Sequence, residues 1–442
     1  MARRFFGTDG VRGVAGEEVT ADLALGLARA ATRLTTSGSG RRPQVLVIRD
    51  TRQSGEMLEA AIAAGVAAAG GDALLGGVLP TPAAPLLIRR YGLDLGVVLS
   101  ASHNPFADNG IKFFGPDGHK LSDQREEEIE AALENATEAT AGAIGHVRSL
   151  HGTLEDYLRE LHTRFAGLDL HGLRVVLDCA NGAAYRAAPE IFRRLGAEVT
   201  ALADAPDGRN INDGVGSTHL DHLVAAVVAG GHDLGFAFDG DADRMLAVDR
   251  TGAVVDGDEL IALAALHLRA GERLPGGGVA VTVMANYGFH TAMRAAGIEV
   301  ATTQVGDRYV LEELRARGWA LGGEQSGHII ELGFSPTGDG IASALLTLEA
   351  LAGGDLSERH AMEKLPQRLV NVRVADRDAR LDDHAVAEAI DRESAALEGR
   401  GRVLVRPSGT EPVVRVMVEA PTEDEAMAVC DRLVAALQAV AA

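Results

Sequence analysis

Three aspartates at alternate positions are the densest group of residues in this sequence that could bind a ligand. Asp239, Asp241 and Asp243 directly follow the apolar segment 236–238, and a single small residue separates each from the next. Carboxylates at this spacing repel one another unless a cation lies between them, and Mg2+ prefers carboxylate and phosphate oxygens. We therefore interpret the three as ligands of one Mg2+.

Two other interpretations compete with a magnesium site. A calcium-binding loop that begins at Asp239 would need Gly at its sixth position and Glu at its twelfth, but Arg244 and Arg250 stand there. A solvated acidic turn is the simpler alternative. We favour the metal site because the aspartates follow an apolar strand and Arg244 comes immediately after them.

A serine loop, residues 100–105, follows another apolar strand. It reads Ser-Ala-Ser-His-Asn-Pro, with Ser102 beside His103. Ligands of open α/β sheets bind at the carboxyl ends of strands, so Ser102 lies where a nucleophile would be useful. These six residues alone favour an ordinary turn, in which the serine is a cap or turn residue and the histidine a hydrogen-bonding partner.

Another group of polar residues, near the carboxyl end of the sequence, is typical of phosphate binding. Arg406, Ser408, Gly409 and Thr410 lie between two predicted strands, and Arg415 follows in the second strand. Hydroxyls, exposed backbone N–H groups and arginines are the donors that phosphate oxygens need. A hairpin turn with arginines at the sheet edge is the alternative.

Further glycine-rich turns carry polar side chains. Residues 322–328 include Glu324 and Ser326, whose oxygens can bind vicinal sugar hydroxyls, and His328. Residues 6–13 surround Arg12, and Lys112 follows the serine loop. Each can also be ordinary turn chemistry. The sequence contains no nucleotide-binding P-loop, dinucleotide fingerprint, zinc-protease helix or serine-hydrolase elbow.

Apolar strands alternate with amphipathic helices through most of the chain, which predicts α/β domains with mixed, mainly parallel sheets. Strand, Ala-Asn, Gly, helix, Gly and Glu-Val occur in this order twice, from Arg174 and from Val279. We interpret this as an internal duplication, with the amino-terminal region as a diverged third copy. The carboxyl-terminal region predicts a smaller α+β domain. The predicted domains are residues 1–153, 154–256, 257–366 and 367–442.

The composition describes an acidic globular protein. Hydrophobic residues make up 46% of the 442 residues, and the formal net charge is -21, so nucleic acid would be repelled. We find no apolar run that predicts a membrane span or a signal peptide, and we expect a cytoplasmic protein. Cys179 and Cys430 offer neither a zinc pattern nor a disulfide framework.

We call residues 322–328 the sugar-type turn and the segment that begins at Arg406 the phosphate loop. Taken in order, the serine loop, the three aspartates, the sugar-type turn and the phosphate loop resemble the α-D-phosphohexomutase superfamily over essentially the whole chain. The resemblance implies four domains around a central cleft, each with one motif. Four details are similar to the branch that acts on an amino sugar: the turn at residues 6–13, Ser100, Gln325 and Gly409.

This resemblance implies interconversion of glucosamine 6-phosphate and glucosamine 1-phosphate, on the route to UDP-N-acetylglucosamine and the cell wall. It implies a phosphoserine at Ser102, a glucosamine 1,6-bisphosphate intermediate and one Mg2+ per chain. The ligands of this ion would be Asp239, Asp241, Asp243 and a phosphate oxygen on Ser102. Either the bisphosphate or a kinase would have to phosphorylate the serine first.

Roles for the other candidates follow from the same resemblance. Lys112 is the first candidate for proton transfer, His328 the second, and Arg12 an electrostatic helper. Glu324 and Ser326 would bind the sugar. The non-reacting phosphate would be held by Arg406, Ser408, Gly409, Thr410 and Arg415. The partner is then a small amino-sugar phosphate, without nucleic acid or membrane, and a homodimer is compatible with this resemblance.

Two alternative functions stay open. One is a mutase that acts on mannose or glucose phosphates, which differ from the amino sugar in few atoms around the 2-position. The other is a Mg2+-dependent sugar phosphatase, in which an aspartate of the acidic cluster rather than Ser102 would be the nucleophile.

Overall fold

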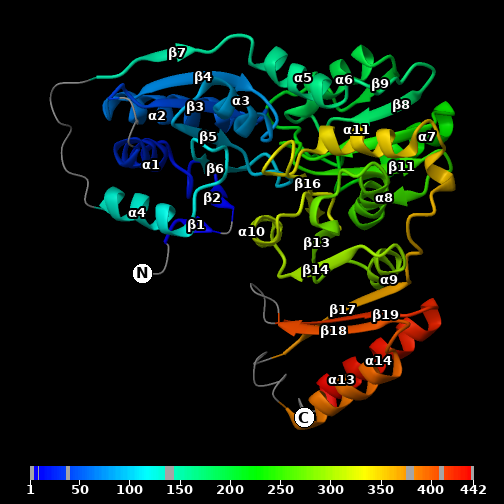
Figure 1. Cartoon of the computed structure of the whole chain (residues 1–442). Coiled ribbons are helices and arrows are strands. Elements are labelled where there is room, and N and C mark those ends of the chain that lie inside the picture. The colour runs from blue at the N-terminus through cyan, green and yellow to red at the C-terminus, as the bar shows by residue number, and fades with distance from the viewer. Residues whose placement is uncertain are drawn as a thin grey trace. The chain divides into compact units, whose positions relative to one another are not determined.

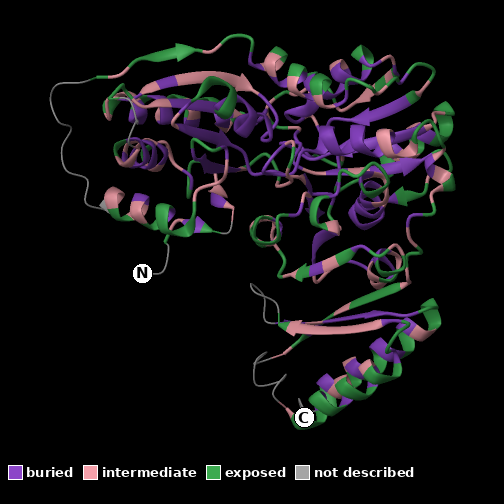
Figure 2. Ribbon diagram, in the orientation of Figure 1, coloured by how far each residue is buried: buried purple, intermediate pink, exposed green. Residues whose placement is uncertain are grey.

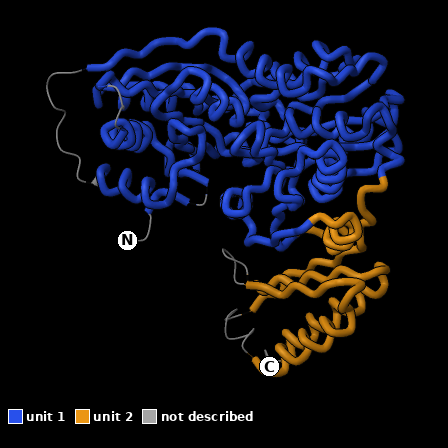
Figure 3. The backbone as a smooth tube through the Cα atoms, in the orientation of Figure 1, with its two compact units in different colours: residues 1–284, 299–359 blue, residues 285–298, 360–442 orange. Residues whose placement is uncertain are grey.

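The structure is a computed structural model, and it describes residues 4–7, 9–35, 40–134, 144–374, 383–407 and 413–439. These residues form four β-sheets with helices between the strands (Figure 1). The chain divides into two compact units (Figure 3). Unit 1 comprises Met1–Met284 and Glu299–Arg359, and unit 2 comprises Ala285–Ile298 and His360–Ala442.

The first sheet of unit 1 has the strand order β1-β2-β6-β5-β3-β4-β7. Its strands are β1 (Phe6–Gly7), β2 (Gly10–Val14), β3 (Gln44–Arg49), β4 (Asp72–Val78), β5 (Leu95–Leu99), β6 (Asp108–Phe114) and β7 (Val147–Ser149). The helices of this region are α1 (Ala21–Leu34), α2 (Ser54–Ala68), α3 (Ala83–Tyr91) and α4 (Asp123–Glu134).

The second sheet has the order β12-β11-β10-β8-β9. Its strands are β8 (Arg174–Asp178), β9 (Glu198–Leu202), β10 (Leu234–Phe238), β11 (Met245–Asp249) and β12 (Val254–Val255). Three helices accompany it: α5 (Thr153–Arg164), α6 (Ala184–Arg194) and α7 (Asp221–Gly230).

The third sheet has the order β14-β13-β15-β16. It consists of β13 (Gly278–Thr282), β14 (Glu299–Thr303), β15 (Leu321–Gly323) and β16 (Ile329–Glu331), with helices α8 (Gly257–Ala270), α10 (Asp307–Arg317) and α11 (Gly340–Leu351). Within the described ranges, no helix is long and apolar enough to cross a membrane.

The three sheets of unit 1 share one arrangement of four strands. The runs β4-β3-β5-β6, β9-β8-β10-β11 and β14-β13-β15-β16 match position by position. In each run the first three strands are parallel and the fourth is antiparallel. This common topology supports the predicted duplication and includes the amino-terminal region as a third copy. The predicted class of mixed, mainly parallel α/β sheets is confirmed.

Burial follows from this layered arrangement. Every residue of β5, β10 and β13 is buried. Figure 2 shows the purple of buried residues along many strands of unit 1. Strands with helices on both faces are expected to be continuous apolar segments, which explains why the sequence shows short apolar runs rather than alternation. The polar residues that follow β5 and β10 therefore lie in loops at the strand ends.

Unit 2 contains a three-stranded antiparallel sheet with the order β17-β19-β18. The strands are β17 (Gln367–Arg373), β18 (Arg402–Pro407) and β19 (Val413–Glu419), and the helices are α13 (His384–Ala396) and α14 (Glu423–Ala439). Apolar residues of both helices, among them Ala389 and Leu433, pack with Val416 of β19 in one core cluster. Helix α9 (Tyr287–Ala295) also belongs to this unit. A small α+β domain is thus confirmed.

Candidate active site

Three of the predicted loops leave equivalent strands. The serine loop follows β5, the aspartate loop follows β10 and the turn with Glu324 follows β15. These are the third strands of the shared four-strand arrangement, so each copy of the fold presents one loop from the same carboxyl end. Ligands of open α/β sheets bind at such ends.

The side chain of Ser102 is held against the aspartate loop. Its Oγ donates a hydrogen bond to Asp239 Oδ2 at 2.5 Å, and His103 Nδ1 lies 3.3 Å from Ser102 Oγ. Ser102 is buried, and its backbone has a left-handed φ of 51°. A non-glycine residue in this conformation stores strain that surrounding contacts must hold in place.

Arg52, which the sequence analysis did not select, supplies many of those contacts. Its guanidinium is completely buried and donates to the carbonyl oxygens of Ser102 and Asn104, each at 2.9 Å. It also donates to the carbonyl oxygens of Pro105 and Asp108. One buried cation therefore binds three carbonyl groups of the serine loop and one at the start of β6, which fixes the shape of that loop.

A short chain of hydrogen bonds completes this support. Arg52 Nε donates to Asp50 Oδ2 at 2.8 Å, and the Ser100 hydroxyl donates to the same oxygen at 2.7 Å. The Ser100 Oγ in turn accepts the Ser102 N–H at 2.9 Å. Asn212, in the loop between β9 and α7, adds a donor, since its Nδ2 lies 2.9 Å from the Ser102 carbonyl oxygen.

The three predicted metal ligands converge. One carboxylate oxygen from each of Asp239, Asp241 and Asp243 lies within 4.8 Å of the others, and all three residues are buried. The Oδ1 atoms of Asp241 and Asp243 have no hydrogen-bond partner within the described residues. Buried anionic oxygens without a donor are costly, so this donor set fits a hard cation such as Mg2+.

The surroundings of this cluster shift the pKa values of Asp239 and Asp241 in opposite directions. Burial raises the pKa of Asp239 well above its ordinary value, and the charges of Asp243 and Asp241 raise it further. Burial also opposes the charge on Asp241, but the Lys112 ammonium and hydrogen bonds outweigh it and lower the pKa. Thr81 supplies one of these bonds, from its hydroxyl to Asp241 Oδ2 at 2.6 Å.

Lys112 is completely buried beside the aspartates. Its Nζ lies 3.0 Å from Asp241 Oδ2 and 3.1 Å from Asp9 Oδ2. Burial disfavours the ammonium, but the carboxylates of Asp241, Asp9 and Asp243 outweigh it and raise the pKa of Lys112. The lysine is therefore charged, and it holds a proton next to the aspartate loop, residues 239–243, which is the predicted metal loop.

A second ionic group connects Arg12 with the third sheet. Asp9 pairs with both Arg12 and Lys120. Lys120 Nζ also lies 2.6 Å from Asp307 Oδ2, and this carboxylate lies 3.8 Å from His328 Nε2. Burial disfavours the Lys120 ammonium, but the carboxylates of Asp307 and Asp9 outweigh it and raise the pKa of Lys120 above its ordinary range. This ionic chain joins the first and third copies within unit 1.

The sugar-type turn supplies one half-buried, one exposed and one buried side chain. Glu324 Oε1 accepts the Gly306 N–H at 3.1 Å. Ser326 is exposed and His328 is buried, with its Nε2 accepting the Gly338 N–H at 3.2 Å. The turn also packs on the second copy, because Met245 N donates to the Gly327 carbonyl oxygen at 3.0 Å.

The remaining predicted residues lie in unit 2. Arg406 on β18 and Arg415 on β19 are directly paired across the sheet. Burial lowers the pKa of Arg406, and the like charge of Arg415 lowers it further. A phosphate dianion would relieve this repulsion. Ser408, Gly409 and Thr410 lie outside the described residues.

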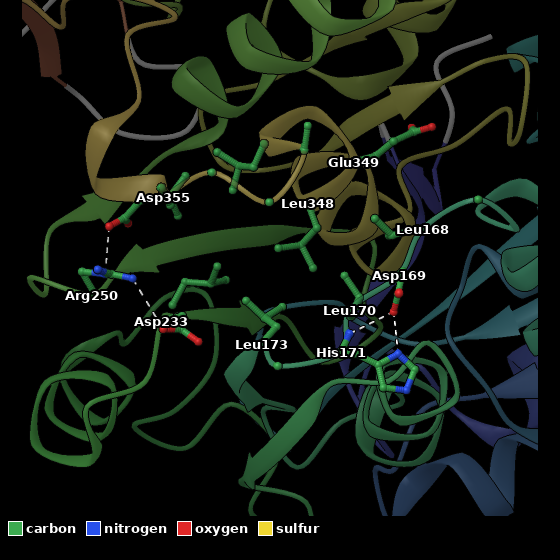
Figure 4. Close-up of a pocket in the computed structure, with 18 residues that line it drawn as sticks. Leu168, Asp169, Leu170, His171, Leu173, Asp233, Arg250, Leu348, Glu349 and Asp355 are labelled. Atoms are coloured by element: carbon green, nitrogen blue, oxygen red, sulfur yellow. Dashed lines mark hydrogen bonds and ion pairs between the residues drawn. The ribbon is translucent and has the colours of Figure 1, made fainter.

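A cavity, whose lining residues Figure 4 shows, contains none of the predicted site residues. Its volume is about 770 Å3, and it is lined by residues 167–173, the start of β10 and the end of α11. Arg250 pairs there with Asp355 at 2.9 Å and Asp233 at 3.5 Å. Leu234 and the metal loop stand at opposite ends of β10, roughly 13 Å apart at about 3.3 Å per residue.

Several residues of the site carried a usable sequence signal and others did not. Asp9 lies within the turn already noted for Arg12, and Arg52 follows β3, the parallel neighbour of β5. Attention to every strand end would have selected both. Asp307 also follows a parallel strand, β14, but Lys120 carries no such signal, and only the folded chain brings the two together.

Comparisons with known proteins agree with this arrangement. The domain models of the phosphoglucomutase/phosphomannomutase family match in order: alpha/beta/alpha domain I at residues 3–140, domain II at 155–252, domain III at 256–369 and the C-terminal domain at 369–436. The boundaries predicted from the sequence remain a prediction. These matches together span most of the chain.

Proteins similar to this chain in sequence or structure belong to the same family. Phosphoglucosamine mutase from Moorella thermoacetica is 52% identical, with 99% of each chain covered. A phosphoglucomutase/phosphomannomutase family protein from Burkholderia thailandensis has a similar crystal structure, with a TM-score of 0.82, 25% identity and coverage of 99% and 98%.

N-acetylphosphoglucosamine mutase from Aspergillus fumigatus, solved with GlcNAc-6P and magnesium, shares the fold at a TM-score of 0.69 and 20% identity, with coverage of 99% and 96%. The family matches cover all three copies of the α/β unit and the small terminal domain. The chain therefore belongs to the phosphoglucomutase/phosphomannomutase family, the α-D-phosphohexomutases, and within it to the phosphoglucosamine mutases.

Proposed function

We propose that the enzyme interconverts glucosamine 6-phosphate and glucosamine 1-phosphate through a phosphoserine at Ser102. The observation that carries this proposal is the position of Ser102 Oγ, 2.5 Å from Asp239 Oδ2 in the buried aspartate cluster. A nucleophile in direct contact with candidate metal ligands is what phosphoryl transfer requires. The identity of the relatives supports the amino sugar as substrate.

The reaction consists of two phosphoryl transfers. In the first, the P–O bond to Ser102 breaks, the sugar O1 bonds to phosphorus, and the O1 proton leaves while the serine oxygen regains one. The product of this half-reaction is glucosamine 1,6-bisphosphate. After the sugar turns around, Ser102 attacks the phosphorus at O6, loses its proton, and O6 takes one up. Atoms and charge balance, and the serine ends phosphorylated.

Residues of the chain can hold the metal and the protons for these steps. Asp239, Asp241, Asp243 and an oxygen of the phosphorylated serine would bind Mg2+, as the orphaned carboxylate oxygens suggest. When bound, this ion would offset negative charge on the transferred group. Lys112, charged and buried, is suited to donate a proton to the departing oxygen, and Arg12 adds positive charge.

Substrate positioning is assigned to the other predicted residues. We propose that Glu324 and Ser326 bind sugar hydroxyls and that His328 is the second candidate for proton transfer. The non-reacting phosphate would bind Arg406, Ser408, Gly409, Thr410 and Arg415. The repulsion between the paired arginines supports this assignment, since an anion would relieve it. The product would feed UDP-N-acetylglucosamine and cell-wall synthesis.

A coupled assay tests the substrate. Purified enzyme is given the 6-phosphates of glucosamine, glucose and mannose in parallel, with Mg2+ and traces of the matching bisphosphates. We expect kcat/KM to be at least about 10-fold higher for glucosamine 6-phosphate, since a single recognised polar group is worth about that much or more.

The other outcomes separate the alternatives. Preference for mannose or glucose 6-phosphate would replace the proposed substrate with another hexose. Release of inorganic phosphate at the rate of substrate loss would indicate a phosphatase. A cytoplasmic location and a homodimer are further proposals, and cell fractionation and sedimentation of the purified protein test them.

A further inference from the structure

Tyr157 and Asp339 form a buried polar pair that the reaction itself does not use. Tyr157 lies on α5, and Asp339 immediately precedes α11. The phenol hydroxyl lies 3.0 Å from both carboxylate oxygens of Asp339, to which it donates. Both side chains are at most 2% exposed. A buried carboxylate persists only where donors compensate its lost hydration.

The same carboxylate fixes the beginning of α11. Asp339 Oδ1 accepts the Ala342 N–H at 2.9 Å, which makes Asp339 the N-cap of the helix. Its backbone carbonyl oxygen accepts the Ser343 N–H at 2.8 Å. The start of α11 is therefore tied to α5 through one carboxylate and one phenol.

The residue after Asp339 contacts the metal loop. Gly340 N–H donates to the Ala242 carbonyl oxygen at 2.9 Å. Ala242 lies between two predicted metal ligands and has a left-handed φ of 56°. A Cβ on Gly340 would lie 2.4 Å from the Arg244 carbonyl oxygen, so only glycine allows this approach. The contact holds a loop conformation that alanine does not favour on its own.

The residue before Asp339 contacts His328. Gly338 N–H donates to His328 Nε2 at 3.2 Å. A nitrogen that accepts this bond carries no proton, so the ring hydrogen lies on Nδ1. The Nδ1 atom is buried and has no hydrogen-bond partner within the described ranges. A Cβ on Gly338 would lie 2.6 Å from the Asp243 carbonyl oxygen, so this turn also touches the metal loop.

We propose that Tyr157 and Asp339 are positioning residues for the phosphoryl-transfer site. Together they hold the start of α11, where Gly340 fixes the metal loop and Gly338 fixes the His328 tautomer. The geometry of the aspartates and the donor atom of His328 are thereby set by one carboxylate. This inference rests on the proposed function, because that function gives both loops their roles.

Tyr157→Phe is the first test, because it removes one hydroxyl and keeps the ring. Loss of a supporting residue typically costs about 10- to 100-fold in metal affinity or activity. We expect kcat to fall within that range and the half-saturating Mg2+ concentration to rise, while KM for the sugar phosphate changes less than about 3-fold. The ring 15N shifts of His328, assigned by difference from His328→Gln, should change from a single Nδ1–H tautomer to a mixture.

Two variants of Asp339 separate positioning from general stability. Asparagine caps helices about as well as aspartate and keeps an oxygen for the phenol. Asp339→Asn should therefore retain most activity, and Asp339→Ala should lose more than Tyr157→Phe does. Thr20→Ala is the matched control, since Thr20 Oγ1 caps α1 by accepting the Leu23 N–H at 3.1 Å. It should lower the melting temperature without changing Mg2+ affinity or the His328 signals.

One set of results would contradict the proposed positioning role of Tyr157 and Asp339. If Tyr157→Phe and Asp339→Ala lower the melting temperature as the Thr20 control does, but leave Mg2+ affinity and the His328 tautomer unchanged, the pair is only structural. If Asp339→Ala does not fold, Tyr157→Phe still decides. Mg2+ titration calorimetry and the 15N shifts need no substrate, so they test this inference even if the wild-type enzyme fails to turn over glucosamine 6-phosphate.

Discussion

Asp339 has a carboxyl group whose titration should be visible in protein stability. Burial raises its pKa to about 7, although hydrogen bonds from the Ala342 N–H and Tyr157 oppose this rise. Because the folded protein binds this proton more tightly than the unfolded chain, the contribution is fully present below pH 4 and is lost as pH rises through 7. Asp339→Asn cannot titrate and lacks this loss.

The measurement compares melting temperatures of wild type and Asp339→Asn from pH 4 to pH 8. All other groups are common to both proteins, so their effects cancel in the difference. The wild type should lose a few degrees relative to the variant as pH rises through this window. Parallel curves would show that the carboxyl keeps an ordinary pKa.

Another residue-scale prediction concerns Asp239 and Mg2+. Burial and the neighbouring carboxylates raise its pKa well above the ordinary value, so without a cation this group retains its proton to higher pH. A metal ligand must be ionised, so binding of Mg2+ releases this proton and the affinity rises with pH. Calorimetry in buffers of different ionisation enthalpy measures the release directly. A pH-independent affinity with no proton release would contradict this prediction.

At the scale of elements, Gly240 determines how closely the metal loop approaches the serine loop. A Cβ at this position would lie 2.5 Å from the Ser102 carbonyl oxygen and 2.8 Å from Asn212 Nδ2. Gly240→Ala should therefore push the two loops apart. A displacement of about 1 Å at a reacting group can reduce the rate about 100-fold, and we expect a loss of that order in kcat.

Gly167→Ala is the matched control, because a Cβ there would meet no atom within 4 Å. It should keep wild-type activity. Circular dichroism would show that both variants fold. Wild-type kcat in Gly240→Ala would mean that the serine and metal loops need not be in contact during transfer.

The sequence predicted elements and loops better than it predicted the contacts between loops. Continuous apolar segments identified β5 and β10, and the residues after them were selected because strand ends bind ligands. Arg52 was missed because an arginine that binds four carbonyl groups has no local pattern. The Tyr157–Asp339 pair is separated by 182 positions, so only the packing of α5 against the start of α11 brings it together.

The whole molecule comprises two units, and the arginines of unit 2 give a prediction at that scale. The intermediate must turn around without escaping, which requires a grip on its non-reacting phosphate. If Arg415 provides that grip, Arg415→Ala should release more glucosamine 1,6-bisphosphate in addition to binding substrate more weakly. Each charge-assisted bond to phosphate is worth about 1.5–3 kcal/mol, so release should rise at least about 10-fold.

Rapid-quench single turnovers with a labelled sugar measure this release. Lys364→Ala, a basic residue of the same unit outside the phosphate loop, is the charge-matched control and should release no more bisphosphate than the wild type. If turnover falls in Arg415→Ala while free bisphosphate stays at the wild-type amount, the arginine serves only the initial capture of an anion by an acidic protein.

The central claim is that the phosphoryl group on Ser102 is the one transferred to the sugar. The direct measurement starts from enzyme carrying 32P, located on Ser102 by peptide mass spectrometry, and adds one equivalent of unlabelled glucosamine 6-phosphate. The label should appear first in glucosamine 1,6-bisphosphate and then at position 1 of glucosamine 1-phosphate, while Ser102 ends phosphorylated without label. Ser102→Ala should fold and lose at least about 1000-fold in turnover. Formation of glucosamine 1-phosphate while the label stays on the enzyme, or wild-type turnover in Ser102→Ala, would contradict the account.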